Sequence, residues 1–229
     1  ATGDGLWCNW LIWSCGGQLV DTNNKVVIDS LPTLKALEYG KELYATFVPG
    51  TLSWLDPNNN KAFLDGQISI TNNGISIYYA TKNSPDAKLK DMAVDIQHAS
   101  YPVGPVGVPT ESHLFFNQMI MKYTKYPNAA KAFLQFMMEQ DQFGAWLTGA
   151  GAYIATPLDG FAKLPIWTVD PKNTPYRDAV KNMRPAGYAG TLGYASAGAA
   201  ADFIVVNMVA EAISGAKSPK EAMERAQKR

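Results

Sequence analysis

The segment of residues 99–109, ASYPVGPVGVP, limits the possible folds more than any other stretch of the chain. Pro102, Pro105 and Pro109 lack a backbone N–H donor and have a fixed φ angle, so the segment can form neither a regular helix nor a central strand. We therefore expect it to be a linker, or a crossing between two parts of the fold.

The composition narrows the class of protein. The 229 residues suffice for one large domain or two smaller ones with a buried core. Apolar residues make up 47% and charged residues 17%, with 20 basic against 20 acidic side chains. This balance argues against a disordered chain and against a partner that is a nucleic acid or an anionic membrane. No apolar run reaches the ~18 residues that a membrane span requires.

The spacing of apolar residues predicts an α/β chain that is rich in helices. Trp7, Trp10 and Trp13 recur on one side of a helix that ends at Gly16–Gly17. A capping box at Ser218 predicts the start of the last helix. Further helices are expected at about 31–47, 57–66, 127–147 and 196–215. Short strands are expected at 25–28, 67–71 and 113–121.

The sequence contains no motif of a known catalytic or metal centre. The patterns GxSxG, HExxH and CxxC and the P-loop are absent. His98 and His113 have no companions at metal-ligand spacing, so we expect no catalytic residue, metal or cofactor. On a helix, Cys8 and Cys15 would lie ~10 Å apart, which exceeds a disulfide, and we expect two free thiols.

The chain is rich in aromatic residues that lie beside small polar ones. It has six Trp and eleven Tyr, many next to Gly, Asn or Pro. Such rings stack on sugars while short polar groups bind the hydroxyls, although Trp residues on one helical side more often belong to a core. Strand geometry would turn one of Tyr78 and Tyr79 outward. At most one of the two rings is therefore expected to meet a ligand, and Phe63, Ile68 and Ile70 are expected to anchor the strand at 67–71.

Six segments, in this order and spacing, resemble the C-terminal half of the family 1 extracellular solute-binding proteins of ABC importers, the maltose-binding-like group. FLDGQISITNNG is similar to FxxGxxAMxxxG of that family, and AAKAFLQFM is similar to AAxxFLxF. SGAKSPKEAMERA is similar to its closing SGxxSxxEALxxA. The other three segments are W…GGQLVD, KALEYGKELY and YPVGP.

The resemblance implies a periplasmic-binding-protein-like II fold, in which two α/β lobes close on a ligand in the cleft between them. This chain would be an α-rich fragment of it. Residues 1–109 would begin the C-terminal lobe, 110–154 would be a returning segment of the N-terminal lobe, and 155–229 would close the C-terminal lobe. The resemblance also implies an exported monomer in the periplasm or outside the cell. It would hand a sugar or polyol to the transmembrane subunits of an ABC permease.

The resemblance also implies which residues contact the solute. Ser76 and Tyr78 match the two positions of an aromatic pair, so one ring is absent and a solute smaller than an oligosaccharide is expected. Tyr78 would then be the ring that meets the ligand, and Tyr79 would pack. Asp202 is either a ligand contact or a polar residue in the first turn of the last long helix, where the helix dipole favours it. The implied ligand-binding residues are Asp4, Trp7, Trp10, Asn73, Ser76, Tyr78, Tyr188, Tyr194 and Asp202.

Two alternatives remain open at this point. One is an enzyme lobe that acts on carbohydrate, which would need two carboxylates ~5 to ~9 Å apart in one cleft. The other is a structural interaction domain. In that case Trp7, Asn73 and Tyr78 would lie in a filled core without a concave surface.

Overall fold

The computed structural model describes residues 5–112, 117–154 and 158–229. Contacts between Cα atoms divide the chain into two compact units. Unit 1 comprises Ala1–Asn72, Tyr101–His113 and Asn182–Arg229, and unit 2 comprises Asn73–Ser100 and Leu114–Lys181. The chain returns to unit 1 at Tyr101, inside the proline-rich segment. The assignment of 1–109, 110–154 and 155–229 to two lobes stays a prediction.

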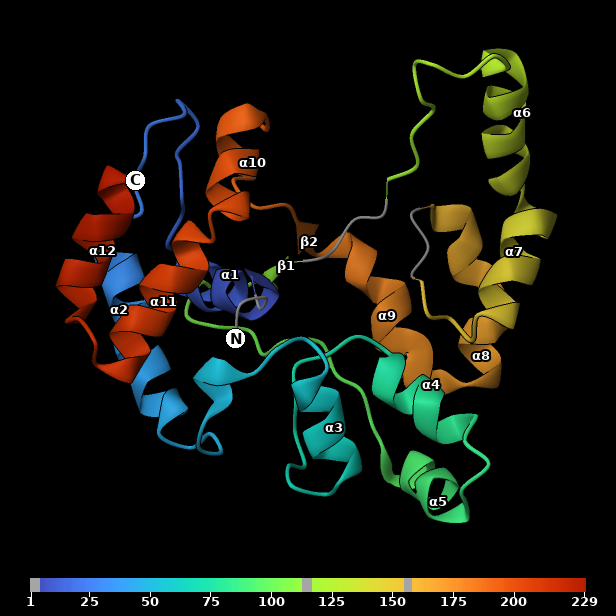
Figure 1. The fold of residues 1–229 in the computed structure, drawn as a ribbon, viewed down its shortest axis with the longest axis horizontal. Helices are drawn as coiled ribbons and strands as arrows, with labels where there is room; N and C mark the ends of the chain where they lie inside the picture. The colour runs from blue at the N-terminus through green and yellow to red at the C-terminus, as the bar shows by residue number, and fades with distance from the viewer. Residues whose placement is uncertain (1–4, 113–116, 155–157) are drawn as a thin grey trace. The chain divides into compact units, whose positions relative to one another are not determined.

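Unit 1 is helical apart from one short parallel sheet. Glu111 pairs with Met183 and Ser112 with Arg184 in this sheet. The strand predicted at 25–28 makes one antiparallel bridge, between Val26 and Val20. The elements of unit 1 are α1 (Gly5–Ser14), α2 (Leu31–Tyr44), η1 (Thr51–Ser53), α3 (Asn58–Leu64), β1 (Glu111–Ser112), β2 (Met183–Arg184), α10 (Tyr194–Ala201), α11 (Ile204–Ser214) and α12 (Pro219–Lys228) (Figure 1).

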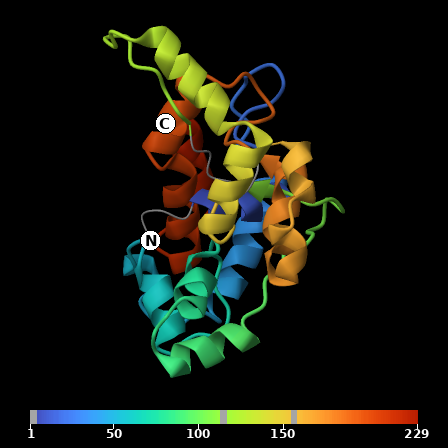
Figure 2. The ribbon, with the colours of Figure 1, turned by 90° about the vertical axis from the view of Figure 1, so that its right-hand side faces the viewer.

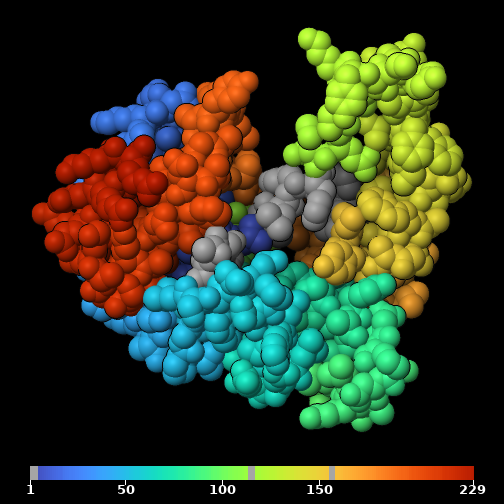
Figure 3. Space-filling model, in the orientation of Figure 1, coloured from blue at the N-terminus to red at the C-terminus, as the bar shows by residue number. Residues whose placement is uncertain are grey.

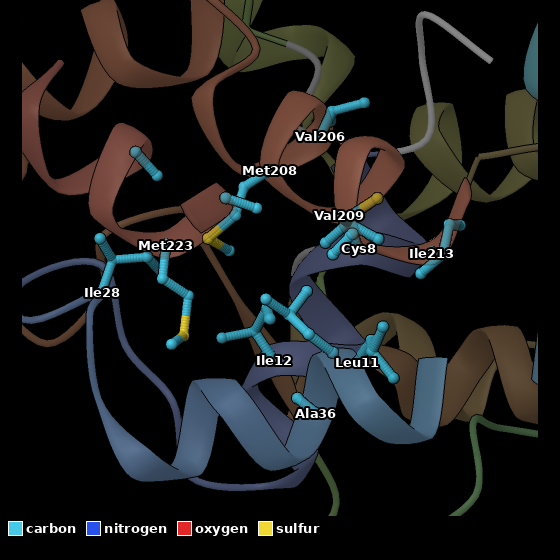
Figure 4. Packing of buried hydrophobic residues seen from close by; sticks show 14 of the residues in the cluster. Cys8, Leu11, Ile12, Ile28, Ala36, Val206, Met208, Val209, Ile213 and Met223 are labelled. Atoms are coloured by element: carbon cyan, nitrogen blue, oxygen red, sulfur yellow. The ribbon is translucent and has the colours of Figure 1, made fainter. Parts of the chain in front are cut away.

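Helix α1 lies at the centre of the core of unit 1. Its sequence, GLWCNWLIWS, is apolar on nearly every side, as expected of a helix that is covered all round. Leu11 and Ile12 lie between Ala36 of α2 and Val209 of α11 (Figure 4). A Cβ on Gly40 of α2 would lie 2.8 Å from Leu11 Cδ2, so this glycine permits the close approach of α1 and α2.

Two predicted helix ends are confirmed in unit 1. Helix α1 ends before Gly16, whose φ of +91° is left-handed, and the amide of Gly17 donates to the carbonyl of Ile12 at 2.9 Å. At the start of α12, Ser218 Oγ accepts from the amide of Glu221, and the Glu221 carboxylate accepts from the amide of Ser218. Both thiols, Cys8 and Cys15, are free, as predicted.

Loss of the cap at Ser218 should destabilise unit 1 measurably. We expect Ser218→Ala to lower the free energy of unfolding by about 1 kcal/mol, because the amide of Glu221 would lose its acceptor. Urea unfolding followed by circular dichroism measures this change. Ser218→Thr keeps the hydroxyl and should lie within a few tenths of a kcal/mol of the wild type. If Ser218→Ala and Ser218→Thr lowered the free energy of unfolding equally, the hydrogen bond of the cap would contribute nothing to stability.

The strand predicted at 67–71 does not form. These residues are irregular, and Phe63 belongs to α3 instead. Ile70 is 87% exposed and anchors nothing. An alternating sequence forms a stable strand only beside other strands, and the described residues contain no strand next to this one. Of the strand predicted at 113–121, residues 113–116 lie outside the described part and 117–121 are irregular.

The last long helix is interrupted. The predicted helix at 196–215 is divided into α10 and α11 at Asp202 and Phe203, and the φ of Phe203 is +53°. By length and composition alone, residues 194–214 would suffice to cross a membrane. In the structure, however, α11 buries its apolar side against α1, α2 and α12, so it is a core helix of unit 1.

Unit 2 consists of short helices. The helix predicted at 127–147 is in fact two helices, because the backbone of Glu139 is extended and its carbonyl accepts from the amide of Phe143. Helix α7 then buries Phe143 and Leu147. The elements of unit 2 are α4 (Ser76–Lys82), α5 (Ala87–Asp95), α6 (Pro127–Met137), α7 (Gln140–Gly149), η2 (Asp159–Lys163), α8 (Ile166–Val169), η3 (Pro171–Asn173), α9 (Thr174–Asp178) and η4 (Ala179–Lys181).

Helix α6 keeps its apolar side exposed. None of its residues is buried, and Phe133 and Phe136 are 59% and 43% exposed. Within unit 2, α6 continues outward from α7 (Figure 2), and its atoms form a column above those of α7 in the space-filling view (Figure 3). Exposed aromatic side chains of this kind add to an apolar surface rather than to a core.

We expect removal of these two rings to change the surface and not the stability. The double variant Phe133→Gln, Phe136→Gln should reduce the fluorescence of added ANS, a dye that binds exposed apolar surface, and leave Tm within about 2 °C. The matched control is Phe143→Gln, a buried residue that stacks on Phe161, and it should lower Tm clearly. A drop in Tm in the double variant would show that α6 is packed.

Candidate functional site

The residues predicted to contact a solute fall in both units. Asn73, Ser76 and Tyr78 belong to unit 2. Asp4 lies outside the described residues. The members in unit 1 are Trp7, Trp10, Tyr188, Tyr194 and Asp202.

Trp10 is a buried structural residue of unit 1. Its ring stacks on Tyr101 with the centroids 5.0 Å apart, and its Nε1–H donates to the carbonyl of Pro102 at 3.1 Å. Trp7 is half-buried and packs edge-to-face against Phe47. Tyr101 thus covers one face of the Trp10 ring, as neighbouring side chains do around a core tryptophan.

Tyr188 lies in a polar and aromatic cluster that we call the Tyr188 cluster, formed by Trp13, Gln18, Arg184 and Tyr188. The guanidinium of Arg184 lies 4.7 Å from the ring centroid of Tyr188 and donates to Tyr188 Oη at 3.0 Å. Gln18 Nε2 donates to the same Oη at 3.4 Å, and the Trp13 ring packs against Tyr188 edge-to-face. Tyr188 Oη accepts two hydrogen bonds, so its own O–H proton is still available for a further acceptor.

Strand β2 positions the cation of this cluster. Arg184 pairs with Ser112 in the parallel sheet, and Ser112 Oγ accepts from Asn9 of α1 at 3.4 Å. Sequence reasoning named Tyr188 as a candidate but not Arg184 and Gln18, which donate to it. No signal in the sequence marks these two residues, because their partners lie far away along the chain.

Tyr194 and Asp202 mark the two ends of α10. Tyr194 is fully exposed at its first turn, and a Cβ on Gly187 would lie 2.9 Å from Ser196 Oγ, which places α10 beside the Tyr188 loop. Asp202 follows the C-terminal end of α10, so the prediction that it lies in the first turn of the last long helix is wrong. The next residue, Phe203, was missed by sequence reasoning.

Phe203 has an unusual backbone for its residue type. Its φ of 53° and ψ of 36° are left-handed, which is rare for a bulky side chain, and its ring is 45% exposed. Such a backbone costs about 1–3 kcal/mol and is often found at ligand-binding sites. The sequence does not predict this left-handed backbone, because an apolar residue between two apolar helical segments is expected to continue one helix.

In unit 2, the ring of Tyr78 is turned inward, whereas the sequence suggested that it would meet a ligand. Both residues lie on helix α4, not on a strand, so neighbouring side chains point about 100° apart. Tyr78 is buried, and its Oη donates to Asp170 Oδ2 at 2.7 Å. Tyr79 is 37% exposed and packs edge-to-face on Tyr153. Asn73 Nδ2 donates to Ser76 Oγ at 3.0 Å at the start of the helix.

Asp170 joins separate elements of unit 2. Its carboxylate accepts from Tyr78, from Lys82 Nζ at 2.5 Å and from the amide of Lys172 at 3.3 Å. Burial would raise the pKa of Asp170, but the hydrogen bonds from Lys82 and Tyr78 outweigh it and hold the pKa below its usual value. Burial, followed by the contact with Asp170, raises the pKa of Tyr78 above its usual range.

Comparison with protein families gives one match. Residues 1–175 match the model of a family described as bacterial extracellular solute-binding protein. No protein among the curated sequences matches the chain.

Solved structures resemble the chain over nearly all of its length. The maltose-bound MalE3 of T. maritima is 20% identical, with a TM-score of 0.74 over 99% of this chain and 56% of that one. A sugar transporter of Arthrobacter chlorophenolicus A6 with bound laminaribiose is 17% identical, with a TM-score of 0.75 over 96% and 54%. An ABC transporter solute-binding protein of Thermotoga lettingae TMO with α-D-tagatose is 15% identical, with a TM-score of 0.68 over 97% and 54%. The chain thus spans about half the length of these proteins.

Proposed function

The chain belongs to the family of bacterial extracellular solute-binding proteins, and from this premise we propose that it is the solute-binding component of an ABC importer. The match of the family model over residues 1–175 is the observation that carries the proposal. The structural likeness adds a helix-rich, partial periplasmic-binding-protein-like fold. The family is non-catalytic, which argues against a carbohydrate-active enzyme lobe.

The proposed solute is a small sugar or polyol. The structural relatives described above hold maltose, laminaribiose and tagatose, and all three are neutral hydroxylated molecules. The chain has no net charge, with 20 basic and 20 acidic side chains, which suits such a solute better than a polyamine or an anion. A protein of this kind would act in the periplasm or outside the cell and deliver the solute to the membrane subunits of a permease.

We propose the Tyr188 cluster and the neighbouring α10 as the solute-contacting surface of unit 1. Tyr188 and Arg184 offer N–H and O–H donors beside aromatic rings, which is the combination that sugar recognition uses. Tyr194, Asp202 and the strained Phe203 extend this surface. For Asp4, Trp7, Trp10, Asn73 and Ser76 a contact with the solute stays a prediction, as does the assignment of most of the chain to a C-terminal lobe.

A thermal-shift screen of the 229-residue protein tests this function. Maltose, laminaribiose and tagatose are compared with mannitol, amino acids and spermidine. A ligand at 100 times its Kd stabilises the folded state by about 2.7 kcal/mol, so a sugar that binds should raise Tm by several degrees. If only charged solutes raised Tm, the proposal of a sugar or polyol would be wrong.

Arg184 should matter most for affinity within unit 1. We expect Arg184→Met to weaken sugar binding about tenfold, because the solute-facing cluster loses its charged donor and the order that this donor gives to Tyr188. Isothermal titration calorimetry measures the change. Arg229→Met removes an exposed arginine outside the cluster and should leave Kd unchanged. Equal affinities of wild type and Arg184→Met would exclude the cluster from the site.

A further inference from the structure

Unit 2 contains a surface hollow of about 580 Å³, which lies within the usual size range of ligand pockets. All of its lining residues belong to unit 2, and none of them is a member of the Tyr188 cluster. Amide, hydroxyl, imidazole, ammonium and carboxylate groups surround it, together with two proline rings. The lining residues are Gln97, His98, Ser100, Pro171, Lys172, Thr174, Pro175 and Asp178.

His98 is the lining residue whose hydrogen bonding is most defined. Its Nδ1 lies 2.8 Å from the carbonyl oxygen of Lys172. A carbonyl only accepts, so Nδ1 must carry the proton, and in the neutral ring Nε2 is then an acceptor. Among the residues that the structure describes, none is hydrogen-bonded to Nε2. The ring of this lining residue therefore keeps one acceptor without a partner among the described residues.

The imidazole ring of His98 is held from two sides. Tyr78 and Tyr176 pack on it edge-to-face, with centroid distances of 5.1 and 4.9 Å. Burial raises the pKa of Tyr176 to about 12, so this neighbour stays neutral. An acceptor that is fixed before binding loses little freedom when a ligand arrives.

Lys172, whose carbonyl oxygen accepts from His98 Nδ1, is itself held in place. Its amide donates to Asp170 Oδ1, and its Nζ donates to the carbonyls of Ala93 and Val94 at 2.8 and 2.6 Å. Asp170 also accepts a hydrogen bond from Tyr78. The same carboxylate therefore binds Tyr78, which packs on the imidazole ring, and Lys172, whose carbonyl accepts from it. The buried Tyr78 thus positions His98 and does not itself face the hollow.

The charges around the hollow favour a neutral ligand. The carboxylate of Asp178 is held by Arg177 at 2.9 and 2.7 Å and by Lys181 at 2.9 Å, and these contacts lower its pKa to about 2. The lining of the hollow contains one carboxylate, that of Asp178, and one ammonium, that of Lys172, so it carries no net charge. A polyhydroxylated molecule can donate to His98 Nε2 and to Asp178 and accept from the amide and hydroxyl groups.

We propose that this hollow binds a neutral polyhydroxylated molecule, with His98 Nε2 accepting a hydrogen bond from one of its hydroxyl groups and Tyr78 holding the imidazole in place. The proposal rests on the proposed function for the ligand class. It adds a contact in unit 2, and it gives Tyr78 the role of a positioning residue in place of the stacking role that the sequence suggested.

The two histidines of the chain allow a direct test by long-range ¹H–¹⁵N NMR of the ¹⁵N-labelled protein. His113→Gln assigns the signals, because His98 is then the remaining histidine. Free protein should show His98 with the proton on Nδ1. Maltose, laminaribiose or tagatose should shift its Nε2 resonance in a saturable way. If none of the three shifts Nε2 at 50 times the protein concentration and at 100 mM, the proposal is overturned.

Variants separate this contact from the rest of binding. His98→Phe keeps a ring between the two tyrosines but lacks Nε2, and should weaken the affinity about tenfold by calorimetry, while His113→Gln should bind like wild type. Unchanged affinity of His98→Phe would overturn the proposal and leave the proposed function standing if sugars still raise Tm. If no sugar raises Tm or shifts Nε2, both fail. Should His98→Phe not fold, the wild-type NMR titration decides.

The positioning role of Tyr78 has its own readout. Tyr78→Leu removes the ring that packs on His98 and should mix the two imidazole tautomers, seen as a shift of both nitrogen signals toward their average. Tyr78→Phe keeps the ring and should restore the Nδ1-protonated form. An unchanged tautomer in Tyr78→Leu would show that Tyr78 does not position His98.

Discussion

Leu11→Ala should lower the free energy of unfolding by about 3 kcal/mol, the largest effect that we expect from one substitution. Leu11 is fully buried and is the side chain that meets Gly40 of α2. The truncation leaves a cavity in the centre of unit 1, where α1, α2 and α11 meet and where surrounding helices can relax only partly.

Urea unfolding gives the size of this loss, and amide hydrogen exchange shows where it falls. Exchange should accelerate in α1, α2 and α11 and change little in α7. Leu55→Ala, at an exposed leucine of the same unit, serves as the control and should stay within about 0.5 kcal/mol. A loss below about 1 kcal/mol for Leu11→Ala would contradict the central place of α1 in the core.

Asp170→Asn should destabilise unit 2 by about 2 kcal/mol. The variant removes the charge that pairs with Lys82 and weakens the acceptor of the buried Tyr78 hydroxyl. The effect stays below that of a fully buried ion pair because Lys82 is half-exposed and can turn to water. Fluorescence of the buried Trp167, also in unit 2, follows the unfolding.

The same substitution should remove part of the acid sensitivity of the protein. The pKa of Asp170 is lower in the folded state than in the unfolded state, so its contribution is present above the unfolded value of about 4. That contribution is lost as the pH falls through the lower folded value. Wild type should therefore lose more stability than Asp170→Asn between pH 5 and the folded pKa of Asp170. Asp91→Asn, an exposed change on α5, should follow the wild-type profile.

Local signals in the sequence predicted local structure well. The capping box at Ser218 and the glycines after α1 determine hydrogen bonds within a few residues of themselves, and both lie where predicted. The three-residue spacing of Trp7, Trp10 and Trp13 correctly indicated a helix, and its apolar composition indicated burial. These features depend on residues that are close together in the sequence.

Features that depend on distant partners could not be predicted. The alternation at 67–71 resembles a strand, but no neighbouring strand is present among the described residues. Tyr78 faces inward because Asp170 lies there, and 92 residues separate the two. Arg184 and His98 likewise have their hydrogen-bonding partners elsewhere in the chain. Aromatic composition suggested a kind of site, whereas the hydrogen-bonding partners could be found only from the fold.

The core built from α1, α2, α11 and α12 has a consequence for synthesis on the ribosome. Helix α12 packs on α2 and α11, and Gln227 Nε2 donates to the carbonyl of Val26 across 201 positions of the chain. At about 5–20 residues per second, α1 waits on the order of ten seconds or longer for its partners. During this time the side of α1 that packs on α11 stays uncovered. The nascent chain should therefore be a strong substrate for holdase chaperones, and its folding should be slow for a helical protein.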